Sequence, residues 1–286
     1  MTESVPELKR GLPPWDWRSL PFVLMHVGAV VLPFFAPFSW KLVGLAIALY
    51  LVRMFAMTGF YHRYFSHRTY KTSRWFQFIM AVWGATALQK GPIWWAAHHR
   101  HHHRYSDKYG DVHSPGLQGF IWAHVGWILD NEWHETNYKA ANDLAKFPEL
   151  RWVNEWHMVP GIALAVVLYL LGGWGAFVWG FVVSTVLNWH ITFMINSLTH
   201  MFGKRRYETK DDSRNSFILA LLTLGEGWHN NHHYYQSSTR QGFYWWEIDI
   251  TYYILKAFAA VGLIWDLREP PAHIVEGHVR KTAEAA

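Results

Sequence analysis

Three clusters of histidines constrain the fold of this chain more than any other feature of its sequence. They occupy residues 62–67, 98–103 and 229–233, and the last two contain the same HxxHH spacing. On a helix, residues at i, i+3 and i+4 share one face, so each HxxHH repeat can aim three imidazoles at a metal ion. A single histidine is usually an ordinary core or surface residue, but three such clusters in one chain predict a metal site. The fold must therefore bring these distant segments together.

Long apolar runs place the predicted metal site beside a membrane. Of the 286 residues, 51% are hydrophobic and 19 are Trp, a residue favoured at membrane interfaces. We expect four transmembrane helices in two hairpins, with the Gly172-Gly173 pair as the turn of the second hairpin. The first and third runs are near the lower length limit for crossing a bilayer. The four runs cover about residues 20–37, 42–61, 158–171 and 176–198.

The remaining segments are expected to form a helical cap in water. The mean hydropathy of -0.04 is low for a chain that lies mostly in a membrane, which predicts a polar cap over residues 62–157 and 200–267. Lys and Arg precede the first run and follow the second and fourth, and such positive charge marks the cytoplasmic side of a membrane. Both termini and the metal site are therefore expected to be cytoplasmic.

The sequence predicts one domain with an all-α fold. That domain covers residues 20–267, after a cytosolic segment over residues 1–19 that lacks the apolar run of a cleaved signal peptide. Residues 268–286 are polar and are expected to form a disordered tail. The apolar stretches at residues 75–88 and 243–267 are expected to lie in the interface or on the cap rather than to cross the membrane.

The metal must be held by nitrogen and oxygen atoms, because the chain has no cysteine. A disulfide, a thiolate site and an iron–sulfur cluster are thereby excluded. The three clusters and His200 together offer nine candidate imidazole ligands, too many for one ion and about right for two. Imidazole suits iron, copper, zinc or nickel, and two redox metals beside lipid suggest the activation of dioxygen. The candidate ligands are His62, His67, His99, His102, His103, His200, His229, His232 and His233.

Other polar residues near the clusters are candidates for supporting roles. Asn196 lies four residues before His200 on the same helical face, where it could orient a metal-bound water or make an interhelical hydrogen bond. Asp111 and Glu226 lie close to the clusters and either orient imidazoles or serve as simple surface charges. No spacing singles out the remaining histidines, which include His113, His124, His134 and His157.

The cluster sequences resemble those of the membrane fatty-acid desaturase family, and most of all its stearoyl-CoA-desaturase-like, delta-9 branch, of bacterial type. The resemblance rests on HRYFSH, HHRHHH and HNNHH, with NSLTH and GEGWHNNHH around the later ones, and it covers about residues 42–246. It implies four transmembrane helices under a cytosolic cap, and a di-iron centre bound by the nine histidines with Asn196 as a water-bridged ligand. His98 and His101 are then not ligands.

The resemblance implies that a saturated fatty acyl chain gains a cis double bond, with delta-9 as the expected position, while dioxygen is reduced to two waters. A bent apolar tunnel would fix the chain beside the metals. Tyr50 lies twelve residues before His62, roughly 18 Å along a helix, and is a candidate for the tunnel floor, although helix packing explains it equally well. The other candidate substrate contacts are Trp95, Gln89, Lys90 and Arg104.

The chain departs from the family pattern where the acyl carrier should bind. Vertebrate-type members carry Arg and then Asp immediately before the second cluster, whereas this chain has Ala97 and His98, so a cation that contacts CoA is missing. The carrier is therefore left open between CoA, acyl carrier protein and an intact lipid. Cations that could compensate are Lys90, Arg100, Arg104 and Lys108.

The electron donor is expected to be a separate protein, because the chain has no haem, flavin or nicotinamide fingerprint. A ferredoxin or a small cytochrome docking on the basic cytosolic face would suffice. The net charge of +5 suits such an acidic partner or anionic lipid, and nothing resembles a nucleic-acid module.

Two other functions remain open. A hydroxylase of the same superfamily would use similar clusters, and a histidine-rich membrane protein could transport or store metal. Transport predicts ligands along the spans, whereas only His26 and His190 lie inside apolar runs.

Overall fold

Three helical stretches are long and apolar enough to cross a membrane. They are Trp17–Phe35, Trp40–Ser66 and Met158–His200, with 19, 27 and 43 residues. They belong to a computed structural model that describes residues 8–277. The first two stretches correspond to the first two predicted runs. The third contains both the third and the fourth run, so length alone gives three candidate spans where the sequence predicted four.

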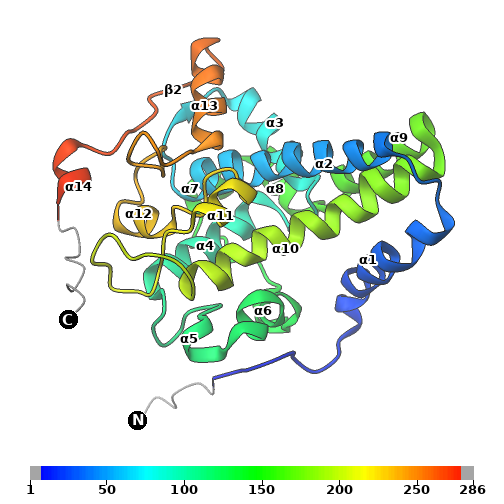
Figure 1. Cartoon of the computed structure of the whole chain (residues 1–286), viewed down its shortest axis with the longest axis horizontal. Coiled ribbons are helices and arrows are strands. Elements are labelled where there is room, and N and C mark those ends of the chain that lie inside the picture. The colour runs from blue at the N-terminus through cyan, green and yellow to red at the C-terminus, as the bar shows by residue number, and fades with distance from the viewer. Residues whose placement is uncertain (1–7, 278–286) are drawn as a thin grey trace.

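The third stretch is interrupted at the predicted glycine pair. Within α9 (Met158–Gly175), Gly173 has φ 64° and ψ -161°, a conformation outside the helical region that glycine adopts without a steric penalty. The chain then turns back, and η6 (Ala176–Val183), a π-helical segment, packs against α9. It continues into α10 (Ser184–Ser197), and Figure 1 shows this turn at the end of the bundle farthest from the short helices. A last turn, η7 (Leu198–His200), ends the stretch.

The second stretch joins the bundle to the histidine clusters. Its helix α2 (Trp40–Phe55) begins at Ser39, whose hydroxyl accepts a hydrogen bond from the Leu42 N–H at 3.3 Å, and it packs against η6 and α10. The helix then widens into η3 (Ala56–Ser66), a π-helical segment in which every residue is buried. The hydrophobic core of the protein is built around η3.

The first stretch lies at the edge of the bundle. It consists of η1 (Trp17–Ser19), α1 (Leu20–Val31) and η2 (Leu32–Phe35). The sequence predicted a hairpin between this stretch and α2, but α1 packs against η6 and α10 instead, and Figure 1 shows it set apart from α2. The link between consecutive helices is covalent, whereas their packing depends on which apolar faces fit together.

Short helices form the rest of the molecule, which we call the cap (residues 67–157 and 201–277). α3 (Arg74–Ala85) and α4 (Pro92–Tyr105) pack against η3, and α12 (His229–Tyr234) carries the third histidine cluster. Proline at the first position of α4 suits a helix start, where its missing N–H has no partner to lose. The other helical segments are α5 (Pro115–Gln118), η4 (Trp122–Gly126), α6 (Trp127–Leu129), η5 (Asn131–Trp133), α7 (Asn142–Ala145), α8 (Pro148–Glu155), α11 (Phe217–Leu222), α13 (Ile250–Ala260) and α14 (Ala272–Glu276).

The sequence predicted an all-α fold, but the structure also contains two short strands. Strands β1 (Lys71–Thr72) and β2 (Ile264–Trp265) pair antiparallel, with Lys71 opposite Trp265. This pairing ties the segment after the first histidine cluster to the chain beyond α13. Two-residue strands have no period that a sequence pattern can reveal, and only the distant partner makes them strands.

The predicted disordered tail is wrong for residues 268–277. These residues lie against the cap, where the carbonyl of Val275 accepts hydrogen bonds from the hydroxyls of Tyr207 and Tyr244 at 2.8 and 3.1 Å. The outer parts of both predicted terminal segments, residues 1–7 and 278–286, lie outside the described residues.

Candidate metal centre

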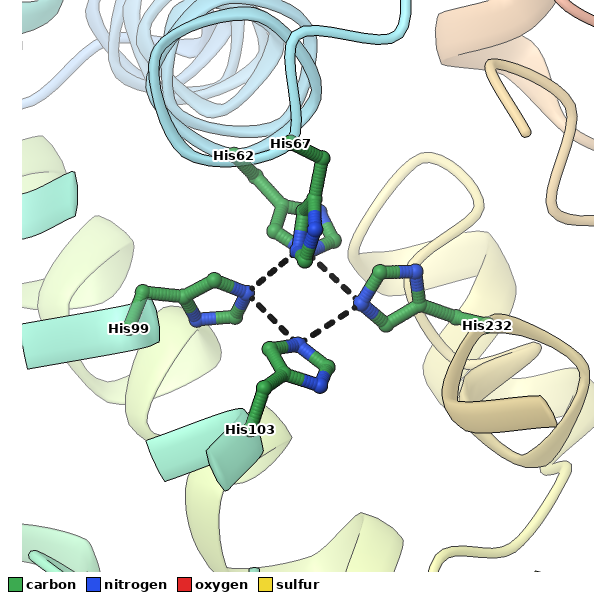
Figure 2. A group of neighbouring side chains, drawn as sticks. All are labelled: His62, His67, His99, His103 and His232. Carbon is green, nitrogen blue, oxygen red and sulfur yellow. Dashed lines mark hydrogen bonds between the residues drawn. The ribbon is translucent and has the colours of Figure 1, made fainter. Parts of the chain in front are cut away.

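Five histidines from three parts of the chain surround one point (Figure 2). Their ligand nitrogens lie within 4.8 Å of one another. The Nε2 atoms are 2.8 Å apart for His67 and His99, 2.9 Å for His99 and His103, 3.0 Å for His103 and His232, and 3.1 Å for His62 and His232. We call these residues the five-histidine group. Neighbouring ligands at right angles, each about 2.0–2.1 Å from a metal, would also be about 3 Å apart.

The π-helical winding of η3 explains how His62 and His67 reach the same point. The N–H of His67 donates to the carbonyl of His62 at 3.2 Å, a bond between residues five apart. In an α-helix such residues point in different directions, at about 100° per residue. The sequence relates these two histidines only by their nearness in the chain, because nothing in the local pattern marks a π-helix.

Four more histidines form a second group beside the first. The Nε2 atoms of His200 and His229 are 3.1 Å apart, and all four residues are buried. The nine predicted ligands are therefore all brought together, divided between the two groups. The members of this four-histidine group are His102, His200, His229 and His233.

Each HxxHH repeat is shared between the two groups. The residues at i and i+4 stay together, as His99 and His103 do in the first group, while His102 at i+3 belongs to the second. In the other repeat, His229 and His233 lie in the second group and the i+3 residue lies in the first. This corrects the prediction that a repeat aims three imidazoles at one ion, because directions at i+3 and i+4 differ by about 100° on a helix.

Four buried or partly buried carboxylates fix the orientation of ligand rings. The three aspartates accept a hydrogen bond from an Nδ1–H, and the glutamate lies against an Nδ1, which leaves the Nε2 lone pair of each imidazole free for a metal. The sequence singled out Asp111 and Glu226, and both are confirmed as ring partners. It missed Asp107 and Asp211, which become partners only through folding. The pairs are Glu226 with His62 at 2.6 Å, Asp111 with His102 at 2.8 Å, Asp107 with His200 at 2.6 Å and Asp211 with His233 at 2.9 Å.

The charges at these pairs favour metal binding. Burial opposes ionisation of Asp107, but its contacts with His200, the backbone N–H of Asp212 and Ser114 outweigh burial and lower its pKa to about 2. Burial outweighs the contact with Asp211 and lowers the pKa of His233 to about 4. A carboxylate that stays ionised and an imidazole that stays neutral are the states in which such a site holds a cation.

One carboxylate is itself held by a buried ion-pair network. Arg63, on η3, is fully buried, and its guanidinium donates to Glu226 Oε1 at 3.0 Å and to Asp249 Oδ2 at 3.0 Å. Glu226 in turn contacts His62. The network links the ring orientation of a ligand to the packing between η3 and the cap.

Unpaired ring nitrogens show that the four-histidine group fits a metal ion. Among the described residues, the buried Nε2 atoms of His102 and His233 have no hydrogen-bond partner. A buried polar atom without a partner costs free energy, and a metal ion would satisfy both lone pairs. The donor set is entirely imidazole, which suits iron, copper, zinc or nickel.

An apolar cavity of about 1040 Å³ leads to the histidines. Its walls come from α1, α9, η6 and α10, and it reaches Trp95, His99 and Asn196. A smaller space shares these three residues and continues between Met54, Met57 and other side chains. The ring of Trp95 stacks on that of His99 with centroids 4.9 Å apart, so it stands where the two spaces meet.

Some of the predicted substrate contacts line this cavity, and others do not. Gln89, Lys90 and Trp95 line it, as does Asn196, the predicted water-bridged ligand. Arg104 is exposed on α4. Tyr50 is buried, its hydroxyl donates to the carbonyl of Leu222, and it is not among the described residues that line either space. Its role as a tunnel floor stays a prediction.

Two neighbouring histidines were predicted not to be ligands. Of the described residues, neither His98 nor His101 belongs to the two groups. The Nδ1 of His98 is 2.8 Å from the carbonyl of Trp94, and the Nε2 of His101 is 2.9 Å from the carbonyl of Gly110.

Comparison with known proteins gives consistent matches along the chain. Residues 38–265 match the family model described as fatty acid desaturase. An acyl-CoA C20 Delta5-desaturase of Anemone leveillei is 38% identical, over 93% of this chain and 86% of the relative. The sn-1 stearoyl-lipid 9-desaturase of Anabaena variabilis is 36% identical, over 90% of this chain and 95% of the relative. A chloroplastic palmitoyl-monogalactosyldiacylglycerol delta-7 desaturase of Arabidopsis thaliana is 38% identical, over 89% and 71%.

Proposed function

The chain belongs to the fatty acid desaturase family, and we propose that it introduces a cis double bond at the delta-9 position of a saturated fatty acyl chain. It is an oxidoreductase and an integral membrane protein. The observation that carries the proposal is an apolar cavity that reaches His99, one of nine converging histidines. The named relatives are desaturases, which disfavours both the hydroxylase and the metal-transport alternatives. Two cyanobacterial relatives named sn-1 stearoyl-lipid 9-desaturases support the delta-9 position.

The proposed cofactor is a pair of iron ions. The five-histidine group would hold one ion, and the four-histidine group the other, with Asn196 as its water-bridged ligand. Bound iron would supply the activation of dioxygen that breaking two unactivated C–H bonds requires. The carboxylates at the ring Nδ1 atoms keep each imidazole in the tautomer that presents Nε2. Without them, the rings would have to be ordered when the ions bind.

The proposed reaction balances with an external reductant. The acyl chain loses two hydrogens, dioxygen takes these together with two electrons and two protons, and two waters form. The task of the cavity is to hold one pair of methylenes beside the ions and to exclude bulk water. Trp95, between the two spaces, is the residue that would limit sliding of the chain.

We propose four membrane crossings. The glycine break divides the third stretch into two arms, so α1, α2 with η3, α9, and η6 with α10 would each cross once. The cap, the metal centre and both termini would then lie on the cytoplasmic side, where Lys and Arg are concentrated.

The acyl carrier is proposed to be CoA or a lipid, since relatives named for each are similarly close to this chain. The proposed electron donor is a ferredoxin or a small cytochrome. It would dock on the cap near exposed cations such as Arg104 and Lys108.

Expression in a desaturase-deficient host, followed by gas chromatography–mass spectrometry of its fatty acids, tests the function. A new monoene that is absent from a His232→Ala control is expected, with the double bond between carbons 9 and 10. A hydroxylated product would move the chain to the hydroxylase branch. A monoene at another position would refute delta-9 alone. If iron-loaded protein supplied with an electron donor makes neither product, the proposal is wrong.

A further inference from the structure

Three histidines outside both metal-binding groups form a line across α1, α10 and η4. His26 Nε2 lies 3.0 Å from His190 Nε2, and His190 Nδ1 lies 3.1 Å from His124 Nε2. At one end, His26 Nδ1 is 2.7 Å from the carbonyl of Phe22. At the other end, His124 Nδ1 is 3.0 Å from the hydroxyl of Ser197.

The geometry of this line suits a hydrogen-bonded chain and not a metal site. His190 uses a different ring nitrogen for each neighbour, whereas a metal needs one nitrogen of every ring aimed at one point. The carbonyl of Phe22 can only accept, so His26 Nδ1 carries a proton and its Nε2 accepts from His190. His190 Nδ1 then accepts from His124 Nε2, while the Ser197 hydroxyl beside His124 Nδ1 donates to the carbonyl of Phe193 at 2.9 Å. Every donor thus finds an acceptor while all three rings stay neutral.

This chain is the polar tie of α1 to the bundle. His26 is the only polar side chain in α1, whose sequence is LPFVLMHVGAVV. No residue of α1 is buried, so apolar packing holds this helix weakly. A histidine inside an apolar span is costly there and is expected to have a function.

The helix held by this tie is one wall of the acyl cavity. On its inner side, Phe22, Met25 and Gly28 line the cavity opposite Val182 and Phe193. Its outer side is exposed, as at Val27, Val30 and Val31. Displacement of α1 would therefore open the cavity to the surrounding lipid rather than to the cap.

We propose that α1 is a lateral gate through which the acyl chain of a bilayer lipid enters the cavity, and that the His26–His190–His124 chain is its latch. The occupant follows from the cavity itself, which is apolar along α1 and is also lined by His99 of the five-histidine group. Arg18 and Lys90 line the same cavity and supply cations for the phosphate of a lipid headgroup. The proposed gate depends on the proposed function in one respect only, which is that the acyl chain reacts at the metal end of the cavity.

A reversible crosslink tests the gate, because the chain has no cysteine of its own. A Cβ placed on Gly28 lies 3.4 Å from Cγ1 of Val182, one of the two γ positions that a cysteine sulfur at residue 182 could take, so cysteines at the two positions are close enough to be joined by a disulfide. The variant Gly28→Cys/Val182→Cys therefore pins α1 to η6 when oxidised and releases it when reduced. Both forms carry the same substitutions, and wild-type protein taken through the same oxidation controls for the reagents.

The readout is lipid entry, which does not depend on turnover. The variant is placed in nanodiscs with a phosphatidylcholine whose saturated acyl chain carries a diazirine, and labelled peptides are identified after photolysis. We expect label on the α10 peptide containing Phe193 and Asn196 in the reduced form, and only dark-control background in the oxidised form. Equal labelling of both forms, with the disulfide verified, overturns the gate. Equal labelling of both forms by a diazirine acyl-CoA would indicate that the acyl chain enters from the cap instead.

Substitutions in the latch test the second half of the proposal. His26→Leu and His190→Leu each remove the same bond, so each should speed labelling by roughly 3- to 30-fold, the range spanned by one interhelical hydrogen bond in a membrane. The double variant should be no faster than either single one. Additive effects, or none, overturn the latch, and His273→Leu on exposed α14 is the control. Labelling that depends on the crosslink without formation of a monoene would support the gate and refute the desaturase proposal.

Discussion

The carboxylate partners of the ligand rings make a sharp test of the metal centre, and Asp107→Asn is the cleanest substitution. Its Oδ2 accepts from His200 Nδ1 at 2.6 Å and its Oδ1 from the Ser114 hydroxyl at 2.8 Å. An asparagine keeps an oxygen for His200, and the serine hydroxyl can turn to accept from the new amide. The substitution therefore removes the charge while keeping the shape and the hydrogen bonds.

The expected loss can be estimated in two ways that agree. The pKa of Asp107 is lowered from 3.8 to about 2, which corresponds to about 2 kcal/mol of interaction with its surroundings. Loss of such a ring partner typically weakens a metal site by about 10- to 100-fold, or about 1.4–2.7 kcal/mol. Because the ligand ring that Asp107 contacts, His200, belongs to the four-histidine group, the five-histidine group should keep its affinity for its metal ion.

Iron content after dialysis against graded chelator measures this effect. At a chelator concentration that leaves wild-type protein fully loaded, the variant should retain one ion per chain instead of two. Asp143→Asn is the matched control, because Asp143 pairs with Arg100 at 2.6 Å and with no ligand ring. Retention of both ions by Asp107→Asn, or equal loss from Asp143→Asn, would refute the reasoning.

Three further predictions follow from the same geometry. Arg63→Met leaves Glu226 and Asp249 buried without their cation and should destabilise the protein by about 3–5 kcal/mol, seen as a lower Tm, whereas an unchanged Tm would contradict the network. Trp95→Ala should lower kcat/KM by roughly 100-fold and spread the double bond over several positions, because the acyl chain can then slide in the cavity. The iron content should stay unchanged. A single double-bond position in the product would argue against a role of Trp95 in limiting sliding. In metal-free protein, the wild type should be more stable than Asp107→Asn by an amount that is constant above pH 3.8 and disappears as the pH falls to about 2, because the pKa of Asp107 is lower in the folded protein than in the unfolded chain. Denaturant melts across this range measure that difference in stability. A difference that does not change with pH would show that Asp107 and His200 do not interact.

Local geometry explains why the sequence could indicate which histidines come together. The HxxHH spacing, the lack of cysteine and the position of the clusters at the ends of apolar runs all precede folding. They predicted that nine histidines converge and that the donors are nitrogen, and the nine do converge. The break at Gly173 was likewise readable, because glycine alone tolerates such a backbone conformation without cost.

Packing between distant segments decided the rest. Asp107 reaches His200 and Asp211 reaches His233 only after the cap has folded onto the bundle. The division of each repeat between two groups depends on which neighbours face its i+3 and i+4 residues. The seat of α1 on η6 and α10 depends on side-chain fit, which consecutive order in the chain does not set. The sequence alone determined which atoms can bind a metal, since that follows from residue type and helical spacing. Only the tertiary structure decided how these atoms are grouped and oriented, since that follows from contacts between residues far apart in the chain.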